Sequence, residues 1–274
     1  MAVATTGDRL TVLERILPHD ILRWVELIRN LAVRDVETRY KHSLLGLYWT
    51  LINPLVTALI FSFVFQDIFH ATSKPIPYVV FLLSGLTFWN FFNNGVYSAT
   101  SSVTGNAQLL AKLYFPRVVL PTAAVLARMI DFAFGLVILL VFFALYRVPL
   151  HWTGFLLIAP ILLLQVVFTL GIAFITSALN VLYRDMSQLI GLLLMVWMYM
   201  SPVMFHPSSA PAELRLVFYV NPIGAMISAE KDLLFTGQIG HPLYLWFAVL
   251  WTVLVYAAGL RLFKRIEPLF AEVM

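Results

Sequence analysis

Two oppositely charged residues, Arg128 and Asp131, lie inside an apolar run that extends from about residue 118 to residue 146. A spacing of three residues places both side chains on one face of a helix, where an ion pair lowers the cost of removing them from water. Charged groups at membrane depth often mark function, but such a pair can also serve helix packing or subunit contact. Both interpretations stay open, and one ion pair is not the proton relay that an ion-coupled carrier needs.

The sequence contains no recognisable catalytic or nucleotide-binding motif. The patterns G-x-x-x-x-G-K-[ST], H-E-x-x-H and G-x-S-x-G are absent, and there is no cysteine. The six histidines are scattered, and no two of them have the spacing of helical metal ligands: His19, His42, His70, His151, His206 and His241. We therefore predict no catalytic residue, no metal site and no cofactor in this chain.

Composition indicates an integral membrane protein. Of the 274 residues, 61% are hydrophobic and 12% are charged, whereas a soluble domain is about half apolar and about a quarter charged. The formal net charge is +4, but the basic residues do not cluster with polar and aromatic partners on a soluble module. Their distribution argues against nucleic-acid binding.

Six apolar runs are each long enough to cross a membrane as a helix, which takes about 20 residues. They lie at about 49–69, 78–98, 118–146, 153–180, 187–205 and 242–263. The sequence therefore predicts an all-α membrane protein with six transmembrane helices. The predicted division is a cytoplasmic N-terminal segment over 1–48, a six-span domain over 49–265 and a cytoplasmic C-terminal tail over 266–274.

Lysine and arginine residues are distributed unevenly between the predicted loops. With the N-terminus on the cytoplasmic side, thirteen of the eighteen fall in cytoplasmic segments and Arg128 lies within a run. The opposite side holds four: Lys74, Arg147, Arg215 and Lys231. Because positive residues that flank spans are retained in the cytoplasm, we expect both termini on that side of the cytoplasmic (inner) membrane.

Three segments outside the apolar runs also have helical character. Apolar residues between Ile21 and Val33 recur at helical spacing, so this helix can lie on the membrane surface or pack on a partner protein. The cytoplasmic loop 99–117 contains a short amphipathic helix that can dock into a groove on a cytosolic partner or sit in the lipid surface. The stretch 206–241, broken by prolines and glycines, predicts two short re-entrant or interfacial helices before the last span.

Aromatic residues make up 15% of the chain, and interfacial belts are their usual place in membrane proteins. A pore lining is the alternative, because aromatic faces stack on sugar rings. The residues concerned are Phe88, Trp89, Phe91, Phe92, Trp197 and Tyr199.

Four segments resemble the membrane subunit of the ABC exporters for polysaccharides and polyol phosphates, the group that exports O-antigen, capsule and teichoic acid. They are RDVETRYKHSLLGLYWTLINPL at 34–55, AKLYFPRVVLP at 111–121, LNVLYRDMSQLIGLLLMVWMYMSPVMF at 179–205 and NPIGAMISAEKDLLF at 221–235. In order, they resemble the junction of interface helix and first span, the coupling helix, the next cytoplasmic turn with the fifth span, and the outer helical segment. The resemblance extends from about residue 20 to residue 265.

This resemblance implies the transmembrane subunit of an ATP-driven exporter that moves a lipid-linked polysaccharide outward. It implies a homodimer of this chain and two copies of a separate cytosolic ATP-binding subunit, which would hold ATP and Mg²⁺. The matching residues are Arg34, Asp35, Arg39, Tyr40 and Lys41 in the interface helix, Lys112, Tyr114, Phe115, Pro116 and Arg117 in the coupling segment, and Arg184 and Asp185 in the second cytoplasmic turn.

Two alternatives stay open. A teichoic acid or polyol-phosphate exporter shares this architecture. A membrane-embedded enzyme or an assembly scaffold could instead use the pair formed by Arg128 and Asp131.

Overall fold

The computed structural model describes residues 19–41, 48–68, 76–112, 115–183, 185–207, 217–218 and 220–270. Throughout these residues the regular structure is helical and contains no strand, which confirms the predicted all-α class. The helices are α2 His19–Tyr40, α3 Tyr48–Ser62 with the π-helical turn η1 Phe63–Ile68, α4 Tyr78–Thr100, η2 Thr104–Asn106, α5 Ala107–Lys112, α6 Val119–Leu145, α7 Trp152–Leu182, α8 Met186–Tyr199, α10 Pro222–Thr236, α11 Pro242–Ile266 and η4 Glu267–Leu269.

Three helices are long and apolar enough to cross a membrane: Val119–Leu145, Trp152–Leu182 and Pro242–Leu269. They correspond to the third, fourth and sixth predicted runs. Ile52–Ser62 and Met186–Tyr199 are shorter apolar helices. At 1.5 Å per residue, the 14 residues of α8 extend about 21 Å, which is shorter than a membrane-spanning helix of about 20 residues. The rest of the fifth predicted run, after Tyr199, consists of turns. The total of six spans stays a prediction.

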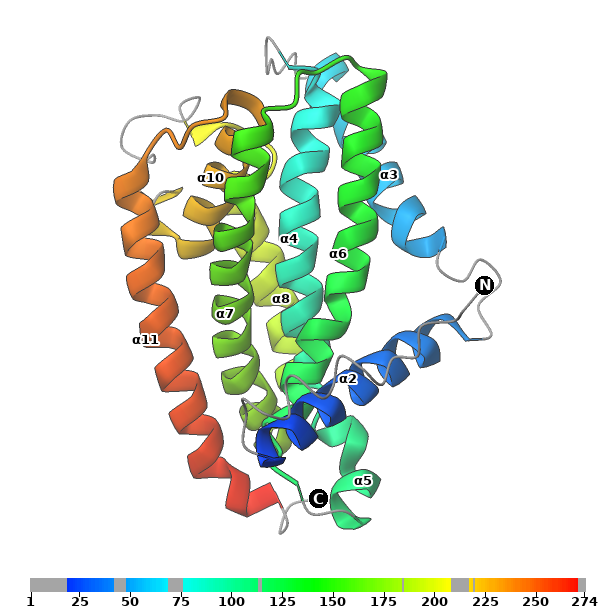
Figure 1. Cartoon of the computed structure of the whole chain (residues 1–274), viewed down its shortest axis with the longest axis vertical. Coiled ribbons are helices and arrows are strands. Elements are labelled where there is room, and N and C mark those ends of the chain that lie inside the picture. Colours follow the sequence, from blue (N-terminus) through cyan, green and yellow to red (C-terminus); the bar gives the residue numbers. More distant parts are fainter. Residues whose placement is uncertain are drawn as a thin grey trace.

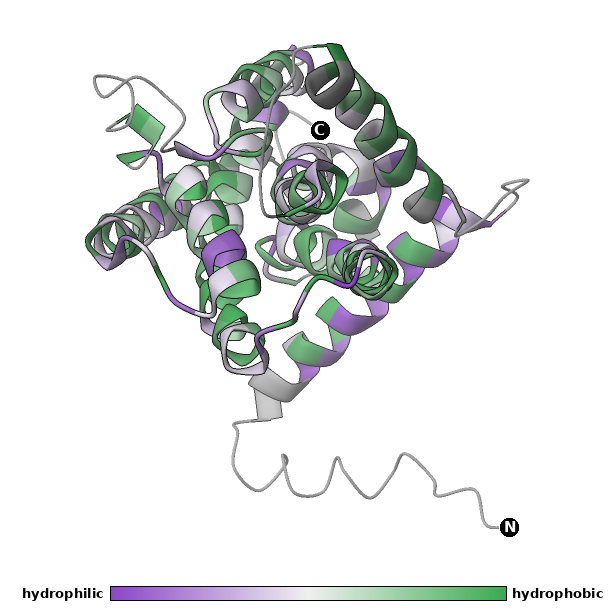
Figure 2. Cartoon of the chain, turned by 90° about the horizontal axis from the view of Figure 1, so that it is seen from above, coloured by the Kyte–Doolittle hydropathy of each residue, from purple (hydrophilic) through white to green (hydrophobic). Residues whose placement is uncertain are grey.

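Helix α4 forms the centre of the bundle, because 18 of its 23 residues are buried. It lies between α6 and α7, and these helices run side by side along the long axis of the molecule (Figure 1). Helix α3 lies outside this group and leans on α4 and α6. Seen end-on, α2 and α3 form two adjoining edges of the outline, and hydrophilic and hydrophobic residues alternate along α2 (Figure 2).

The segments predicted to be cytoplasmic gather at one end of the bundle. Helix α2 crosses that end at a slant, and α5 and the C-terminal turn lie beside it, whereas α10 lies at the opposite end (Figure 1). The side of the membrane on which this end lies stays a prediction.

The broken stretch 206–241 contains one of its two predicted short helices, α10, which is buried along most of its length. The helix begins with Pro222, whose fixed φ suits the first turn, and ends at Gly237, whose φ of +73° closes the C-terminus in the left-handed conformation. The second predicted helix falls mostly on residues outside the described part of the chain.

Two glycines allow α7 and α11 to pack closely. A Cβ atom at Gly259 would lie 2.2 Å from the backbone oxygen of Gly171, and one at Gly171 would lie 2.8 Å from the Cα of Tyr256. Small residues permit such close backbone approach, which is a main source of helix association in membranes.

We predict that Gly259→Ala separates α7 from α11 and lowers the thermal midpoint of the purified protein, with a cost of about 1–3 kcal/mol for overpacking. The control is Gly191→Ala in α8, where the new Cβ would meet only Tyr97 at 3.8 Å. Thermal unfolding in detergent checks the prediction, and equal midpoints for the two variants would contradict it.

Candidate functional site

One face of α2 packs on the protein itself. Leu31 is buried in a cluster with Leu120 of α6 and Phe174 of α7, and Trp24 and Leu27 are partly buried beside it. The sequence left open whether this face meets lipid or a partner protein, and in this structure much of it meets the chain's own bundle. That contact places the charged C-terminal half of α2 against α6.

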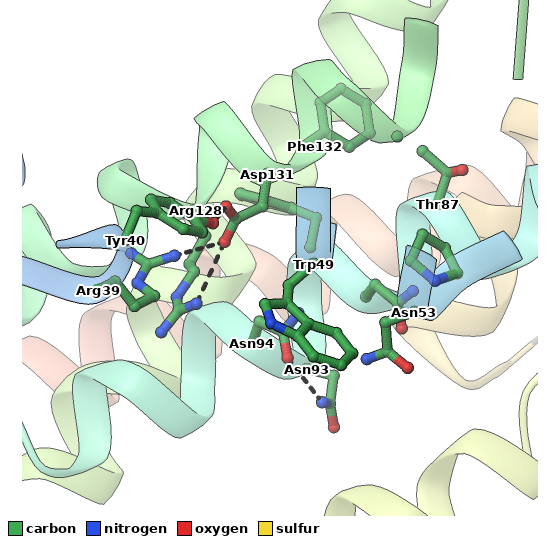
Figure 3. Close-up of a pocket in the computed structure, with 14 residues that line it drawn as sticks. Arg39, Tyr40, Trp49, Asn53, Thr87, Asn93, Asn94, Arg128, Asp131 and Phe132 are labelled. Atoms are coloured by element: carbon green, nitrogen blue, oxygen red, sulfur yellow. Dashed lines mark hydrogen bonds and ion pairs between the residues drawn. The ribbon is translucent and has the colours of Figure 1, made fainter. Parts of the chain in front are cut away.

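A cluster of charged residues joins α2 to α6 around the carboxylate of Asp131 (Figure 3). Arg39 Nη1 donates a hydrogen bond to Asp131 Oδ2 at 2.6 Å, and the Tyr40 hydroxyl donates to Oδ1 at 2.5 Å. Arg39 Nη2 also donates to Asp35 at 2.7 Å. The predicted ion pair exists as well, since Arg128 Nη1 lies 3.1 Å from Asp131 Oδ2. Asp131 is therefore a shared acceptor for two helices.

Arg128 extends the cluster to α4. Its Nε donates a hydrogen bond to the Ser98 hydroxyl at 2.7 Å. The side chains of Arg39, Arg128 and Asp131 are only 22%, 19% and 15% exposed, so these contacts lie largely out of water. The cluster ties α2, α4 and α6 together at one point.

The surroundings keep Arg39 and Tyr40 protonated as hydrogen-bond donors. Burial lowers the pKa of Arg39, but its hydrogen bond to Asp35 and the charge of Asp131 outweigh this effect and leave the pKa raised. Burial, together with the hydrogen bond to Asp131, raises the pKa of Tyr40 to about 12. Both groups therefore donate to Asp131 at neutral pH.

A cavity of about 440 Å³ adjoins this cluster, between α2, α3, α4 and α6. Figure 3 shows Trp49 and Asn53 of α3 facing Asn93 and Asn94 of α4 across it. Its polar lining comprises Arg39, Asn53, Thr87, Asn90, Asn93, Asn94, Arg128 and Asp131, and its aromatic lining comprises Tyr40, Trp49, Phe91 and Phe132. A cavity of this size and mixed lining is typical of a small-molecule site.

The C-terminal turn holds the base of the coupling segment. The backbone N–H of Arg117 donates to Glu267 Oε1 at 3.1 Å, and its guanidinium donates to the backbone oxygen of Glu267. The same guanidinium lies 5.6 Å from the ring centre of Phe270, which is fully buried. Phe115 is buried in the same apolar cluster.

Comparisons with known proteins bear on this arrangement. Residues 26–235 match the model of the ABC-2 type transporter family. The chain belongs to the ABC-2 type transporter family. It is 30% identical to an O-antigen export system permease protein of Klebsiella pneumoniae, over 91% of this chain and 95% of that protein. It is 28% identical to a protein of the same description from Myxococcus xanthus, over 93% and 98%. It is 24% identical to a polysialic acid transport protein of Escherichia coli, over 88% and 93%.

The remaining residues predicted for the interface helix, the coupling segment and the second cytoplasmic turn of this ABC-2 chain do not form one site. Arg34 donates to Asn106 at 2.5 Å, next to a second polar cavity under α2. Lys41 is exposed, and the backbone carbonyl of Asp185 accepts the first hydrogen bonds of α8. Arg184, Tyr114 and the Lys112 side chain lie outside the described residues.

Four of the predicted aromatic residues are buried in the bundle. Phe88, Trp89, Phe91 and Phe92 are at most 2% exposed, and Phe91 also borders the cavity. Their role in a belt or a pore stays a prediction. Trp197 is partly buried and its indole donates to Asn221 at 2.9 Å, whereas Tyr199 is 58% exposed.

Sequence reasoning missed the asparagines of the cavity. Asn90, Asn93 and Asn94 interrupt an apolar run within five residues, and polar groups at membrane depth are costly enough to deserve notice. It also missed Glu230 in α10, which is fully buried and whose carboxyl oxygens accept no hydrogen bond from any described residue. Burial without a partner favours the neutral, protonated form of this group.

Lys231 was predicted only as an outer-side charge, but it is buried against the end of α8. Its Nζ donates to the backbone oxygens of Pro202 at 2.9 Å and Val203 at 2.7 Å, and it lies 3.7 Å from the ring centre of Phe81. These carbonyl oxygens supply the acceptors that a fully buried Lys side chain requires. Gly85 makes room for it, since a Cβ there would lie 2.8 Å from Nζ.

We predict that Asp131→Asn lowers the thermal midpoint by an amount equivalent to roughly 3 kcal/mol, because it leaves two largely buried guanidinium groups without their shared carboxylate. The control is Glu26→Gln, which removes an exposed ion pair of α2 at 3.9 Å and should cost less than about 1 kcal/mol. Thermal unfolding of both variants in detergent is the measurement. An Asp131→Asn protein as stable as the control would show that the cluster contributes little.

We predict that Phe270→Ala destabilises the end of the bundle that carries α2 and α5 by about 3–5 kcal/mol, since the ring is fully buried between Phe263 and Arg117. Leu269→Ala is the matched control, because the adjacent Leu269 side chain is 42% exposed. Limited proteolysis and thermal unfolding should distinguish the two variants, and equal behaviour would speak against an anchoring role for Phe270.

Proposed function

We propose that this chain is the membrane subunit of an ATP-driven exporter that moves a lipid-linked polysaccharide outward across the cytoplasmic membrane. The observation that carries the proposal is the near full-length similarity to permeases named for O-antigen and polysialic acid export. The fold supports it, because three helices are long and apolar enough to cross a membrane, and one of them, α6, lines a polar cavity together with α2, α3 and α4.

Six membrane crossings with both termini in the cytoplasm belong to this proposal. Helices α3, α4, α6, α7, α8 and α11 would make the crossings. Apolar outer faces suit contact with lipid or with a second copy of the chain in a homodimer, and exposed residues of α11 include Leu243, Trp246, Leu250 and Leu254.

Energy for transport would come from two copies of a separate cytosolic ATP-binding subunit, which would hold ATP and Mg²⁺. Its docking surface would be the end of the bundle that carries α2, α5 and the C-terminal turn (Figure 1). Basic residues at this end, including Arg29, Arg261 and Lys264, can help to select the partner electrostatically.

Two mechanical links would carry the movement of the ATPase into the membrane. Arg39 and Tyr40 connect α2 to Asp131 of α6, and Arg117 connects the coupling segment to Glu267 at the end of α11. The ATPase can shift the equilibrium between two arrangements of the helices only by the difference in its affinity for them. Through the first link the ATPase would act on α6, and through the second it would act on α11.

Reconstitution tests the proposed function. The tagged chain is co-expressed with candidate ATPase subunits, purified and placed in lipid vesicles with lipid-linked glycan on the ATP-accessible side. We expect a complex that holds equal numbers of the two subunits and transfers glycan only with ATP. A partner ATPase without its catalytic residue is the control. Movement of a small solute along an ion gradient without ATP would overturn the proposal, and selective transfer of a polyol-phosphate polymer would favour teichoic acid export instead.

A further inference from the structure

The cavity between α2, α3, α4 and α6 carries polar groups deep inside the bundle. Asp131 follows the first residue of α6, Val119, by 12 positions, which is about 18 Å along the helix axis. Asn90 and Asn94 face the cavity from one side of α4, and Asn53 faces it from α3. Asn90 and Asn94 are partly buried, and amide groups that leave water are costly unless a ligand or bound water satisfies them.

The amides of the cavity have hydrogen-bonding capacity to spare. No described residue forms a hydrogen bond with the side chain of Asn53 or Asn90, and Asn93 reaches only the Asn94 oxygen, at 3.3 Å. Each primary amide offers two donors and one acceptor with two lone pairs. Together they suit a ligand that both donates and accepts many hydrogen bonds.

Charge in the cavity does not favour an anion. The two guanidinium groups of Arg39 and Arg128 already bind the carboxylates of Asp35 and Asp131, so the formal charges of this cluster sum to zero. A phosphate would have to displace carboxylates from both arginines before it could bind. A neutral, hydroxyl-rich group meets no such competition.

Besides amides and charged groups, the cavity is lined by the aromatic ring of Trp49. Trp49 is 53% exposed, so the cavity reaches the surface of the protomer beside α3, and its ring lies next to the asparagines (Figure 3). An indole face is a large apolar surface with a polar edge, which matches the C–H face of a sugar ring bordered by hydroxyl groups.

We propose that this cavity binds one uncharged sugar residue of the transported glycan, with Asn53, Asn90 and Asn94 as hydrogen-bonding groups and Trp49 as a stacking surface. The inference rests on the proposed export of a polysaccharide and assigns a specificity site within each protomer. Movement of α2 changes the site, because Arg39 and Tyr40 form part of its wall. The occupied site and the position of the interface helix are therefore coupled.

The test uses the complete complex of permease and ATPase in lipid vesicles, with lipid-linked glycan extracted from the source cells as the probe. The readout is the glycan concentration that gives half-maximal stimulation of ATP hydrolysis. Asn53→Leu and Asn90→Leu should each raise this concentration about threefold to tenfold, as expected for the loss of one or two hydrogen bonds. The effects should multiply in the double variant. The matched control is Gln238→Leu, which removes an exposed amide in the turn after α10. This variant should leave the half-maximal glycan concentration unchanged.

Two further measurements keep the test decisive. Asn53 is exposed on α3, so Asn53→Leu should retain the thermal midpoint of the unmodified protein and report binding alone. Inorganic pyrophosphate should not displace the glycan. An unchanged half-maximal concentration in the double variant, or displacement by pyrophosphate, would overturn the sugar site. If the unmodified complex shows no response to glycan and no transfer, the proposed function itself fails.

Discussion

The carboxylate of Asp131 is the group on which the arrangement of α2, α4 and α6 depends. It accepts hydrogen bonds from Arg39, Tyr40 and Arg128, and so it fixes an amphipathic helix to the transmembrane bundle at a single buried point. Charges that have left water must be paired and hydrogen-bonded, and removal of one partner leaves the others uncompensated. The position of α2 is thus specified by electrostatics as well as by the apolar contact at Leu31.

The two ends of the bundle are held together by different physical means. At the end that carries α10, Lys231 binds the carbonyl groups that follow α8 and packs on Phe81, inside a region filled by buried apolar residues. At the end that carries α2, the apolar contact of Leu31 is joined by a polar cluster, and two cavities border the helix. Packed apolar contacts resist deformation, whereas a polar cluster beside a cavity can exchange partners. The architecture therefore places its adaptable part next to the expected motor.

The cavity also gives the asparagines of α4 a purpose within an otherwise buried helix. Packing alone explains the apolar positions of α4, since it lies at the centre of the bundle. It does not explain three amides, which turn toward α3 and α6 and line the same space as the charged cluster. A polar pocket, the amphipathic helix α2 and a surface-exposed tryptophan are thereby brought together in one protomer.

Local patterns in the sequence determined the helical class, the principal apolar helices, the amphipathic α2 and the spacing of Arg128 and Asp131. These features depend on neighbours within one or two helical turns, and hydrophobicity and periodicity report them directly. The family resemblance likewise follows from contiguous segments, and the comparisons confirm it.

Only the tertiary structure decided which distant residues meet. Arg39 and Asp131 are 92 positions apart, and no spacing rule connects them. Phe88 and Trp89 are of the residue types found in interfacial belts, yet they are buried because α4 packs against α3, α6, α7, α8 and α10. The pairing of Lys231 with the end of α8 likewise depends on how the chain returns to the bundle. Composition and periodicity describe one helix at a time, whereas burial and ion pairing arise from the packing of helices against each other.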